Sequence, residues 1–154
     1  MDAAELRALL ANNPITREYF GGVVSQDQLQ QLKVDEDKTC FYVVNTDYTG
    51  QPGEHWTVIF LQKDSIPEFF DSLANPPKTY GKNFTNFLIQ HGPNFLISRK
   101  RIQAKESSAC GQFCVYFIFH RCLKYTMEHI LNMFSWTKYI RNDIQARKFV
   151  DTIS

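Results

Sequence analysis

The chain has 154 residues, of which 44% are hydrophobic and 14% aromatic. This composition excludes an intrinsically disordered chain, and the length predicts one domain, residues 1–154, with a core rich in aromatic rings. The formal net charge of +1 excludes a strong overall field, so neither nucleic acid nor a membrane is indicated as the main partner.

The four cysteines are too few for a disulfide framework. Three of them, Cys110, Cys114 and Cys122, fall in one apolar stretch, which is typical of buried, reduced thiols. The first residues are acidic rather than apolar, which argues against a secretory signal. No apolar run approaches the roughly 20 residues that a membrane-spanning helix needs. We therefore expect an intracellular protein without a membrane partner.

The first half of the chain predicts one helix and three strands. Residues 3–11 combine strong helix formers with apolar residues at helical spacing, and a helical turn is expected at 25–33. Three segments are rich in β-branched and aromatic residues, as buried strands are: 39–45, 55–62 and 66–70. The last of these strands ends at Asp71.

The second half predicts mainly helices. Apolar residues at helical spacing indicate a helix at 79–91, and residues 95–103 are expected to form a fourth strand. A buried helix follows, and then about two further helices from Thr126 to the end, the last with Ile140, Ile144 and Phe149 on one stripe. This order predicts an α+β fold, with a central mixed or mostly antiparallel sheet flanked by helices.

The segment from Gln103 to His120 begins polar and becomes almost continuously apolar after Cys110. Ser107 or Ser108 is expected to cap a buried helix that starts near Cys110. The first turn of a helix has unpaired N–H groups and the positive end of the helix dipole, and both lower the pKa of a thiol. The sequence therefore predicts that Cys110 is a nucleophilic thiolate at the N-terminus of a core helix.

A thiolate nucleophile needs a general base, a group that orients the base, and donors for the oxyanion. His55 opens a strand after a glycine-containing loop, Asp71 follows the next strand, and Gln103 precedes Cys110 by seven positions. Taken singly, each residue has an ordinary structural explanation: a surface histidine, a turn opener, a strand-end glutamine and a core cysteine. Their order and spacing together favour an active site.

Several segments in the same order as these residues resemble a known family. They are Tyr19-Phe20-Gly21-Gly22, then Val44-Asn45-Thr46 followed after eight residues by His55-Trp56, then Phe70-Asp71, Gln103, and Ser108-Ala109-Cys110-Gly111-Gln112-Phe113-Cys114. Together they resemble the adenovirus protease (adenain) family of cysteine endopeptidases, which is related in fold to the proteases of ubiquitin-like modifiers.

The resemblance implies a role for each candidate residue and an adenain-like fold. Cys110 would be the nucleophile, His55 the general base and acid, and Asp71 the group that orients the imidazole. Gln103 and the backbone N–H of Cys110 would form the oxyanion hole. Trp56 would line the substrate cleft beside the histidine.

The chain departs from the adenovirus enzymes in three ways. Its acidic member is Asp71, where those enzymes have glutamate; aspartate is the residue of the ubiquitin-like-protein proteases and holds an imidazole equally well. No cysteine lies between Cys40 and Cys110, so disulfide attachment of a viral activator peptide is not implied. The chain is also shorter. We therefore expect the source to be a related adenovirus-like virus or a virus-like mobile element rather than an adenovirus proper.

A short basic run, Arg99, Lys100 and Arg101, precedes Gln103. Its ordinary interpretation is a solvated strand end, and its functional interpretation is a nucleic-acid contact. The adenovirus family uses DNA as a cofactor, so the resemblance implies a DNA or peptide activator, although the chemistry itself requires no cofactor. The spacing of Cys110, Cys114 and His120 on one helix does not converge on a metal, and no metal site is expected.

The sequence thus predicts a viral-type thiol endopeptidase, expected to be a monomer. By resemblance, it would cleave structural precursor proteins at glycine-containing sites during virion maturation, in the host nucleus and the virion. Two alternatives stay open: a protease that removes ubiquitin-like proteins from conjugates, and a non-catalytic interaction protein that has kept the fold.

Overall fold

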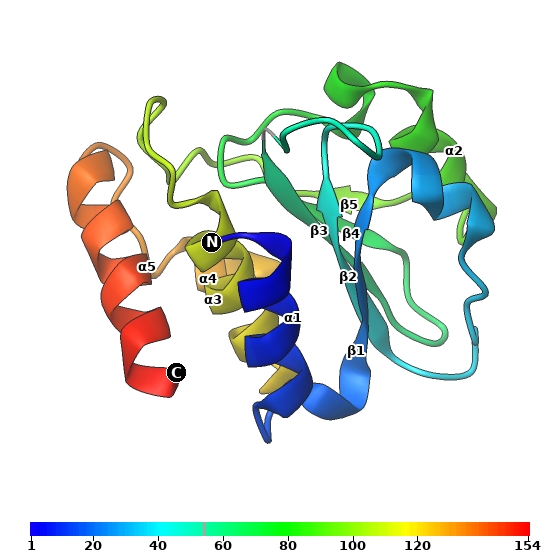
Figure 1. Ribbon diagram of the computed structural model, residues 1–154, viewed down its shortest axis with the longest axis horizontal. Coiled ribbons are helices and arrows are strands. Elements are labelled where there is room, and N and C mark those ends of the chain that lie inside the picture. The colour runs from blue at the N-terminus through cyan, green and yellow to red at the C-terminus, as the bar shows by residue number, and fades with distance from the viewer. Residues whose placement is uncertain (54) are drawn as a thin grey trace.

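The computed structural model describes residues 1–53 and 55–154, and at its centre lies a five-stranded sheet with the order β1-β2-β3-β4-β5 (Figure 1). The strands are β1 (Phe20–Ser25), β2 (Cys40–Asn45), β3 (Trp56–Leu61), β4 (Glu68–Phe70) and β5 (Leu96–Ile97). β2, β3 and β4 pair antiparallel, whereas the two outer pairs, β1 with β2 and β4 with β5, are parallel. The predicted α+β class with a mixed sheet is confirmed.

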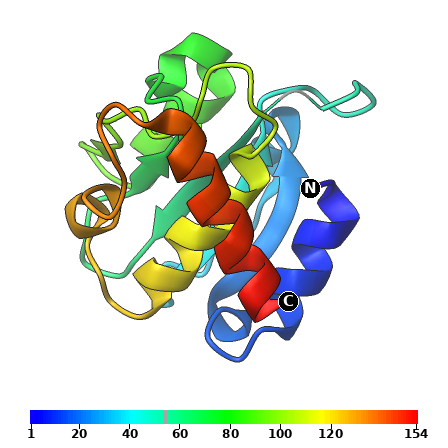
Figure 2. The same cartoon turned by 90° about the vertical axis from the view of Figure 1, so that its left-hand side faces the viewer.

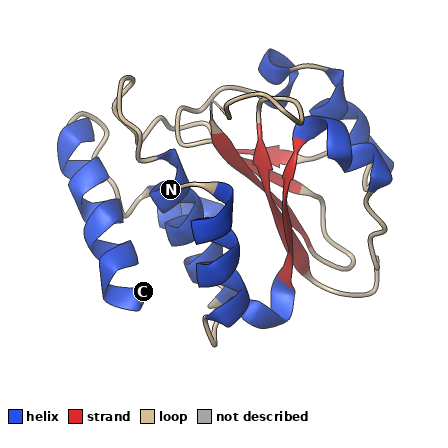
Figure 3. Cartoon of the chain, viewed as in Figure 1, coloured by secondary structure: helices blue, strands red, loops and turns tan. Residues whose placement is uncertain are grey.

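Helices cover both faces of this sheet (Figure 3). The α-helices are α1 (Ala3–Asn12), α2 (Lys82–Gln90), α3 (Cys110–Cys122), α4 (Met127–Leu131) and α5 (Tyr139–Ile153). Three 3₁₀ helices accompany them: η1 (Arg17–Tyr19), η2 (Gln26–Gln31) and η3 (Pro77–Tyr80). α1 and α3 lie on one face and α2 on the other, while α5 packs along α3 (Figures 1 and 2). None of the described helices is long and apolar enough to cross a bilayer.

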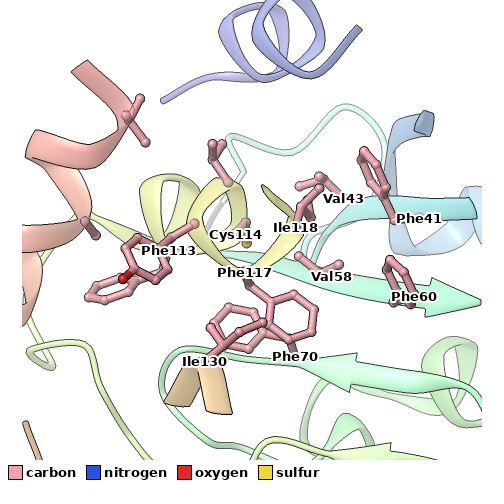
Figure 4. Packing of buried hydrophobic residues seen from close by; sticks show 14 of the residues in the cluster. Phe41, Val43, Val58, Phe60, Phe70, Phe113, Cys114, Phe117, Ile118 and Ile130 are labelled. Atoms are coloured by element: carbon pink, nitrogen blue, oxygen red, sulfur yellow. The ribbon is translucent and has the colours of Figure 1, made fainter. Parts of the chain in front are cut away.

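The central strands are continuously apolar because both of their faces are buried. Alternate side chains point toward α3 and form one core with it, and the labelled members from the sheet are Phe41, Val43, Val58, Phe60 and Phe70 (Figure 4). The intervening side chains form a second core with η2 and α2, and they are Tyr42, Val44, Ile59, Leu61 and Phe69. The sheet is thus fixed from both sides, which holds the strand ends that carry the candidate site.

α3 is the buried core helix that the sequence predicts, and it begins at Cys110. Phe117 on its sheet-facing side stacks on Phe70, with ring centroids 4.4 Å apart. At its other end, Arg121 donates two hydrogen bonds to the Glu68 carboxylate, of 3.0 and 2.8 Å. Because both groups are largely buried, this bidentate pair anchors the helix to β4.

The start of α3 differs from the predicted cap. Its N-cap is Ala109, without a side-chain hydrogen bond, rather than Ser107 or Ser108. The Ser107 hydroxyl instead accepts the Ala109 N–H (3.0 Å), and the Ser108 hydroxyl accepts a hydrogen bond from Arg147 of α5 (3.2 Å). The two serines therefore shape the loop before the helix rather than close its first turn.

Two predicted elements are wrong in extent. The strand expected at 95–103 is limited to β5, because the following residues leave the sheet to bond with the β4 end and with the region around α4. The helix expected at 79–91 is divided at Gly81, whose φ of 115° separates η3 from α2. In α5 the buried residues are Asn142, Asp143, Ala146 and Val150, whereas Ile140 and Ile144 are exposed.

Candidate active site

The sheet topology brings two of the candidate residues together. β3 and β4 run antiparallel, with Val58 opposite Phe70, so the residue before β3 and the residue after β4 lie at the same end of the sheet. These residues are His55 and Asp71. The His55 Nε2 donates to the Asp71 Oδ1 over 2.6 Å, and both side chains are buried, with Asp71 completely inaccessible.

The Asp71 carboxylate is held by further donors. Its Oδ1 also accepts the backbone N–H of Leu73 (2.9 Å), and its Oδ2 accepts a short hydrogen bond from the Tyr80 hydroxyl. The backbone of Asp71 exchanges two hydrogen bonds with the Ser98 hydroxyl, of 2.8 and 3.0 Å. A carboxylate with this many partners has one orientation, and it therefore fixes the plane of the His55 ring.

Cys110 reaches the same imidazole from α3. The side chains of His55 and Cys110 are hydrogen-bonded to each other, and because Nε2 is bonded to Asp71, Nδ1 is the nitrogen that faces the sulfur. The backbone N–H groups of Trp56 and Gly111 also donate to this sulfur. The structure thus places Asp71, His55 and Cys110 in one continuous hydrogen-bonded chain.

The electrostatics of these three residues favour an ion pair between Cys110 and His55. Burial acts to raise the pKa of the Cys110 thiol, but the hydrogen bonds and charge of His55 and the two backbone N–H groups outweigh burial and lower it. Burial acts to lower the pKa of His55, but Asp71 and then Cys110 raise it to about 9. Both shifts favour a thiolate–imidazolium pair, which is the reactive form of a cysteine nucleophile.

Gln103 lies beside these three residues, and both the oxygen and the nitrogen of its side-chain amide are hydrogen-bonded. Its backbone N–H donates to the Ser72 carbonyl (3.1 Å), which holds it next to the residue that follows Asp71. Its Oε1 accepts the Ser72 hydroxyl (2.5 Å), and its Nε2 donates to the Ser107 carbonyl (2.8 Å). An amide nitrogen carries two hydrogens, so one N–H remains for an acceptor in the cleft that Gln103 and Cys110 both line.

This cleft has a volume of about 610 Å³ and opens at the surface over Cys110 and His55. Trp56 forms part of its wall, and its indole N–H donates to the Met1 carbonyl over 3.0 Å. Gly111 is closely packed here, because an added Cβ would lie 3.0 Å from the Met1 Cβ. The position of Trp56 agrees with the predicted substrate contact, and that role stays a prediction.

The basic run before Gln103 does not form one surface, and the prediction of a nucleic-acid contact is wrong for Lys100. This side chain is buried, and its ammonium group donates to the carbonyls of Leu131 (2.9 Å) and Phe134 (2.6 Å). The Arg101 guanidinium lies 3.9 Å from the centroid of the Tyr139 ring. Arg99 is exposed, and a nucleic-acid contact stays a prediction for the two arginines.

Among the described residues, sequence reasoning missed two whose hydroxyls bond to the side chains of predicted site residues. The apolar spacing places Tyr80 on the core side of a helix, and Ser72 falls in the turn after Asp71, but their hydroxyls bond to Asp71 and Gln103 respectively. A tyrosine at helical spacing indicates core packing, and nothing in the sequence marks its hydroxyl as a partner of a residue nine positions earlier. Within residues 1–53 and 55–154, no group of three or more His, Cys, Asp or Glu could hold a metal ion.

No family model matches the chain, and no curated protein matches it. Among solved structures it is similar to the ASFV pS273R protease, with 21% identity and a TM-score of 0.45, over 70% of this chain and 43% of the other. It is also similar to the SUMO protease Ulp1, with 12% identity and a TM-score of 0.47, over 100% of this chain and 79% of the other. The chain thus spans less than half of the ASFV protease. With similarity at this level, any functional assignment rests on the geometry of the site.

Proposed function

We propose that the chain is a cysteine peptidase, with Cys110 as nucleophile and His55 as general base and acid. The observation that carries this proposal is the contact of the buried Asp71 and His55 with the half-buried Cys110, in which the pKa of the thiol is lowered and that of the imidazole is raised. A structural cysteine in an apolar core has the opposite shift, as Cys114 of the same helix does: burial raises the pKa of its thiol well above the usual value.

The first half of the reaction forms an acyl-enzyme. The Cys110 thiolate attacks the carbonyl carbon of the scissile peptide, a C–S bond forms, and the electron pair of the carbonyl moves to its oxygen. The backbone N–H of Cys110 and the free N–H of Gln103 donate to this oxyanion. When the intermediate collapses, the C–N bond breaks, and the leaving amine takes its proton from the His55 imidazolium.

The second half restores the enzyme. Neutral His55 removes a proton from water, and the resulting hydroxide attacks the thioester carbon. The C–S bond then breaks, which releases the carboxylic acid product and regenerates the thiolate and the imidazolium. Throughout both halves, Asp71 holds the ring through Nε2, so that Nδ1 stays directed at the sulfur and at the substrate.

We further propose protein precursors cleaved at glycine-containing sites as substrates. The support is the resemblance of the sequence motifs to adenovirus proteases, together with a surface cleft large enough for an extended peptide. A role in virion maturation, in the host nucleus and the virion, and activation by DNA or a peptide rest on the motif resemblance alone.

The test is a peptide-library cleavage profile of the recombinant protein, measured with and without DNA. We expect cleavage by the wild type, no cleavage by Cys110→Ala, and normal cleavage by the matched control Cys122→Ala at the other end of α3. A parallel assay with ubiquitin-like conjugates separates deconjugation from endopeptidase activity. Cleavage by Cys110→Ala at the wild-type rate would refute the assignment.

A further inference from the structure

The Tyr80 hydroxyl contacts the Asp71 carboxylate at the oxygen that does not bond to His55. It donates to Asp71 Oδ2, while the His55 Nε2 donates to Oδ1. Leu73 provides a second donor to Oδ1. Among the described residues, Tyr80 is the one donor within hydrogen-bond distance of Oδ2, and since Asp71 is completely inaccessible, water does not replace it readily.

Tyr80 is itself held in place by the surrounding structure. It ends η3, and its backbone carbonyl accepts a hydrogen bond of 2.9 Å from the buried amide of Gln26. Its hydroxyl accepts a 3.0 Å hydrogen bond from Asn75 Nδ2. The ring packs 5.9 Å from that of Phe84 and lines the cleft with its centroid 6.0 Å from that of His55. The donor to Asp71 is thus fixed in direction by contacts at both ends.

We propose that Tyr80 is a positioning residue for the Cys110–His55 pair: its hydroxyl orients the Asp71 carboxylate and holds part of its charge, which limits how strongly Asp71 retains the His55 proton. The inference rests on the proposed function, because it concerns the same site. It assigns to Tyr80 a role in setting the pH range over which the ion pair exists.

The physical reason is the sharing of one negative charge between two donors. A charge-assisted hydrogen bond to Oδ2 draws electron density away from Oδ1. Without the hydroxyl, the uncompensated carboxylate attracts the imidazolium more strongly, and His55 gives its proton to a leaving amine less readily. Burial and the nearby Asp71 raise the pKa of Tyr80, so the phenol stays a donor at every pH at which the pair is formed.

Among the described residues, few other titratable groups act on this site. From α3 they are Cys110 and Cys114, and from the start of β3 it is His55. Lys105 and Glu106 line the mouth of the cleft and are exposed to solvent, where their charges are screened. A change in the titration of His55 after loss of the hydroxyl therefore reports on the contact between Tyr80 and Asp71.

The experiment is the pH dependence of Cys110 carboxymethylation by iodoacetate, which needs no substrate. The rate rises as the thiolate forms and falls as the imidazolium that attracts the anionic reagent is deprotonated, which gives a bell-shaped profile. Tyr80→Phe keeps the ring in the cleft wall and removes the hydroxyl, and we expect it to move the falling limb upward by about 0.5 to 1 pH unit. Asn75→Ala should move it the same way but less, because Asn75 strengthens the phenol as a donor.

Two controls show whether the effect passes through the carboxylate. Tyr116→Phe removes a tyrosine hydroxyl that bonds to Met133 and Gln145, away from the site, and should leave both limbs in place. In an Asp71→Asn background, Tyr80→Phe should cause no further upward shift. Should Tyr80→Phe fail to fold, the Asn75→Ala profile decides.

The outcomes separate this inference from the proposed function. A bell-shaped wild-type profile whose falling limb stays in place or moves downward in Tyr80→Phe would overturn the inference alone. An undiminished upward shift in the Asp71→Asn background would also overturn it. A wild-type profile without a falling limb would overturn the ion pair itself, and with it both proposals.

Discussion

Replacing Asp71 by Asn should lower the pKa of His55 substantially. The structure raises this pKa from 6.5 to about 9, with the Asp71 hydrogen bond as the largest contribution that raises it and Cys110 as the next. The difference corresponds to about 3 kcal/mol in favour of the imidazolium. If Asp71 supplies half or more of it, Asp71→Asn should lower the pKa by about 1 to 2 pH units and so reduce the ratio of imidazolium to neutral imidazole at a given pH by about 10- to 100-fold.

The assay is an NMR titration of the histidine ring protons in the wild type and in Asp71→Asn. The chain has four histidines, and the spectrum of His55→Ala assigns the relevant signal. We expect a midpoint near 9 for His55 in the wild type and a clearly lower one in Asp71→Asn. An unchanged midpoint in the variant would refute the role given to Asp71.

The same pKa fixes the sign of the pH dependence of stability. Because the folded-state pKa of His55 is raised, its contribution to the unfolding free energy is fully present below pH 6.5 and is lost as the pH rises through about 9. The lowered pKa of Cys110 has the opposite effect, since its contribution is present above the ordinary thiol pKa and is lost as the pH falls through the lowered value.

Three further predictions concern the residues around the site. Gln103→Ala should reduce turnover by about 10²- to 10³-fold through loss of an oxyanion donor, while Cys110 keeps its wild-type rate of alkylation; a loss of both would point to a general distortion. Lys100→Met should lower the unfolding free energy in urea by about 1–3 kcal/mol, because two buried carbonyls lose their donor, and unchanged stability would restore the surface interpretation. Phe117→Ala should cost about 3–5 kcal/mol in the same assay, since this ring is buried and stacked on Phe70; a loss below about 1 kcal/mol would contradict its place in the core.

Much of the architecture was predictable because the apolar patterns are strong. The segment Cys40–Asn45 is continuously apolar, and such a run is stable only in a strand buried on both faces, which is where β2 lies. The apolar run after Cys110 likewise requires a helix with a partner on every side, and α3 has the sheet, α1, α4 and α5 around it.

The errors arose where tertiary contacts override local propensity. Residues 98–103 were predicted to continue the strand that begins at Phe95, but the Ser98 hydroxyl bonds to the backbone of Asp71, and the Lys100 ammonium is turned to the carbonyls of Leu131 and Phe134. Neither partner is close in sequence, so a pattern of single residues cannot reveal them. In α5 the apolar stripe noted in the sequence includes Ile140 and Ile144, and the structure leaves both exposed.

The candidate site also has features that the sequence predicted and features that it did not. The order and spacing of His55, Asp71 and Cys110 predicted that they meet, and the antiparallel pairing of β3 and β4 with α3 beside them explains why they do. The contacts of Tyr80 with Asp71 depend on the path of the chain through η3, which no spacing rule describes. The catalytic roles of the residues stay predictions until activity is measured.

The most direct test of the ion pair is labelling of Cys110 by a neutral thiol reagent in mild acid, at about pH 5 to 6, where an ordinary thiol is protonated. We predict that Cys110 is labelled in the wild type and not in His55→Ala. Cys122 serves as an internal control, because burial raises the pKa of its thiol to about 12, so it should stay unlabelled in both proteins. Equal labelling of Cys110 in the two proteins, or labelling only in alkali, would contradict the account.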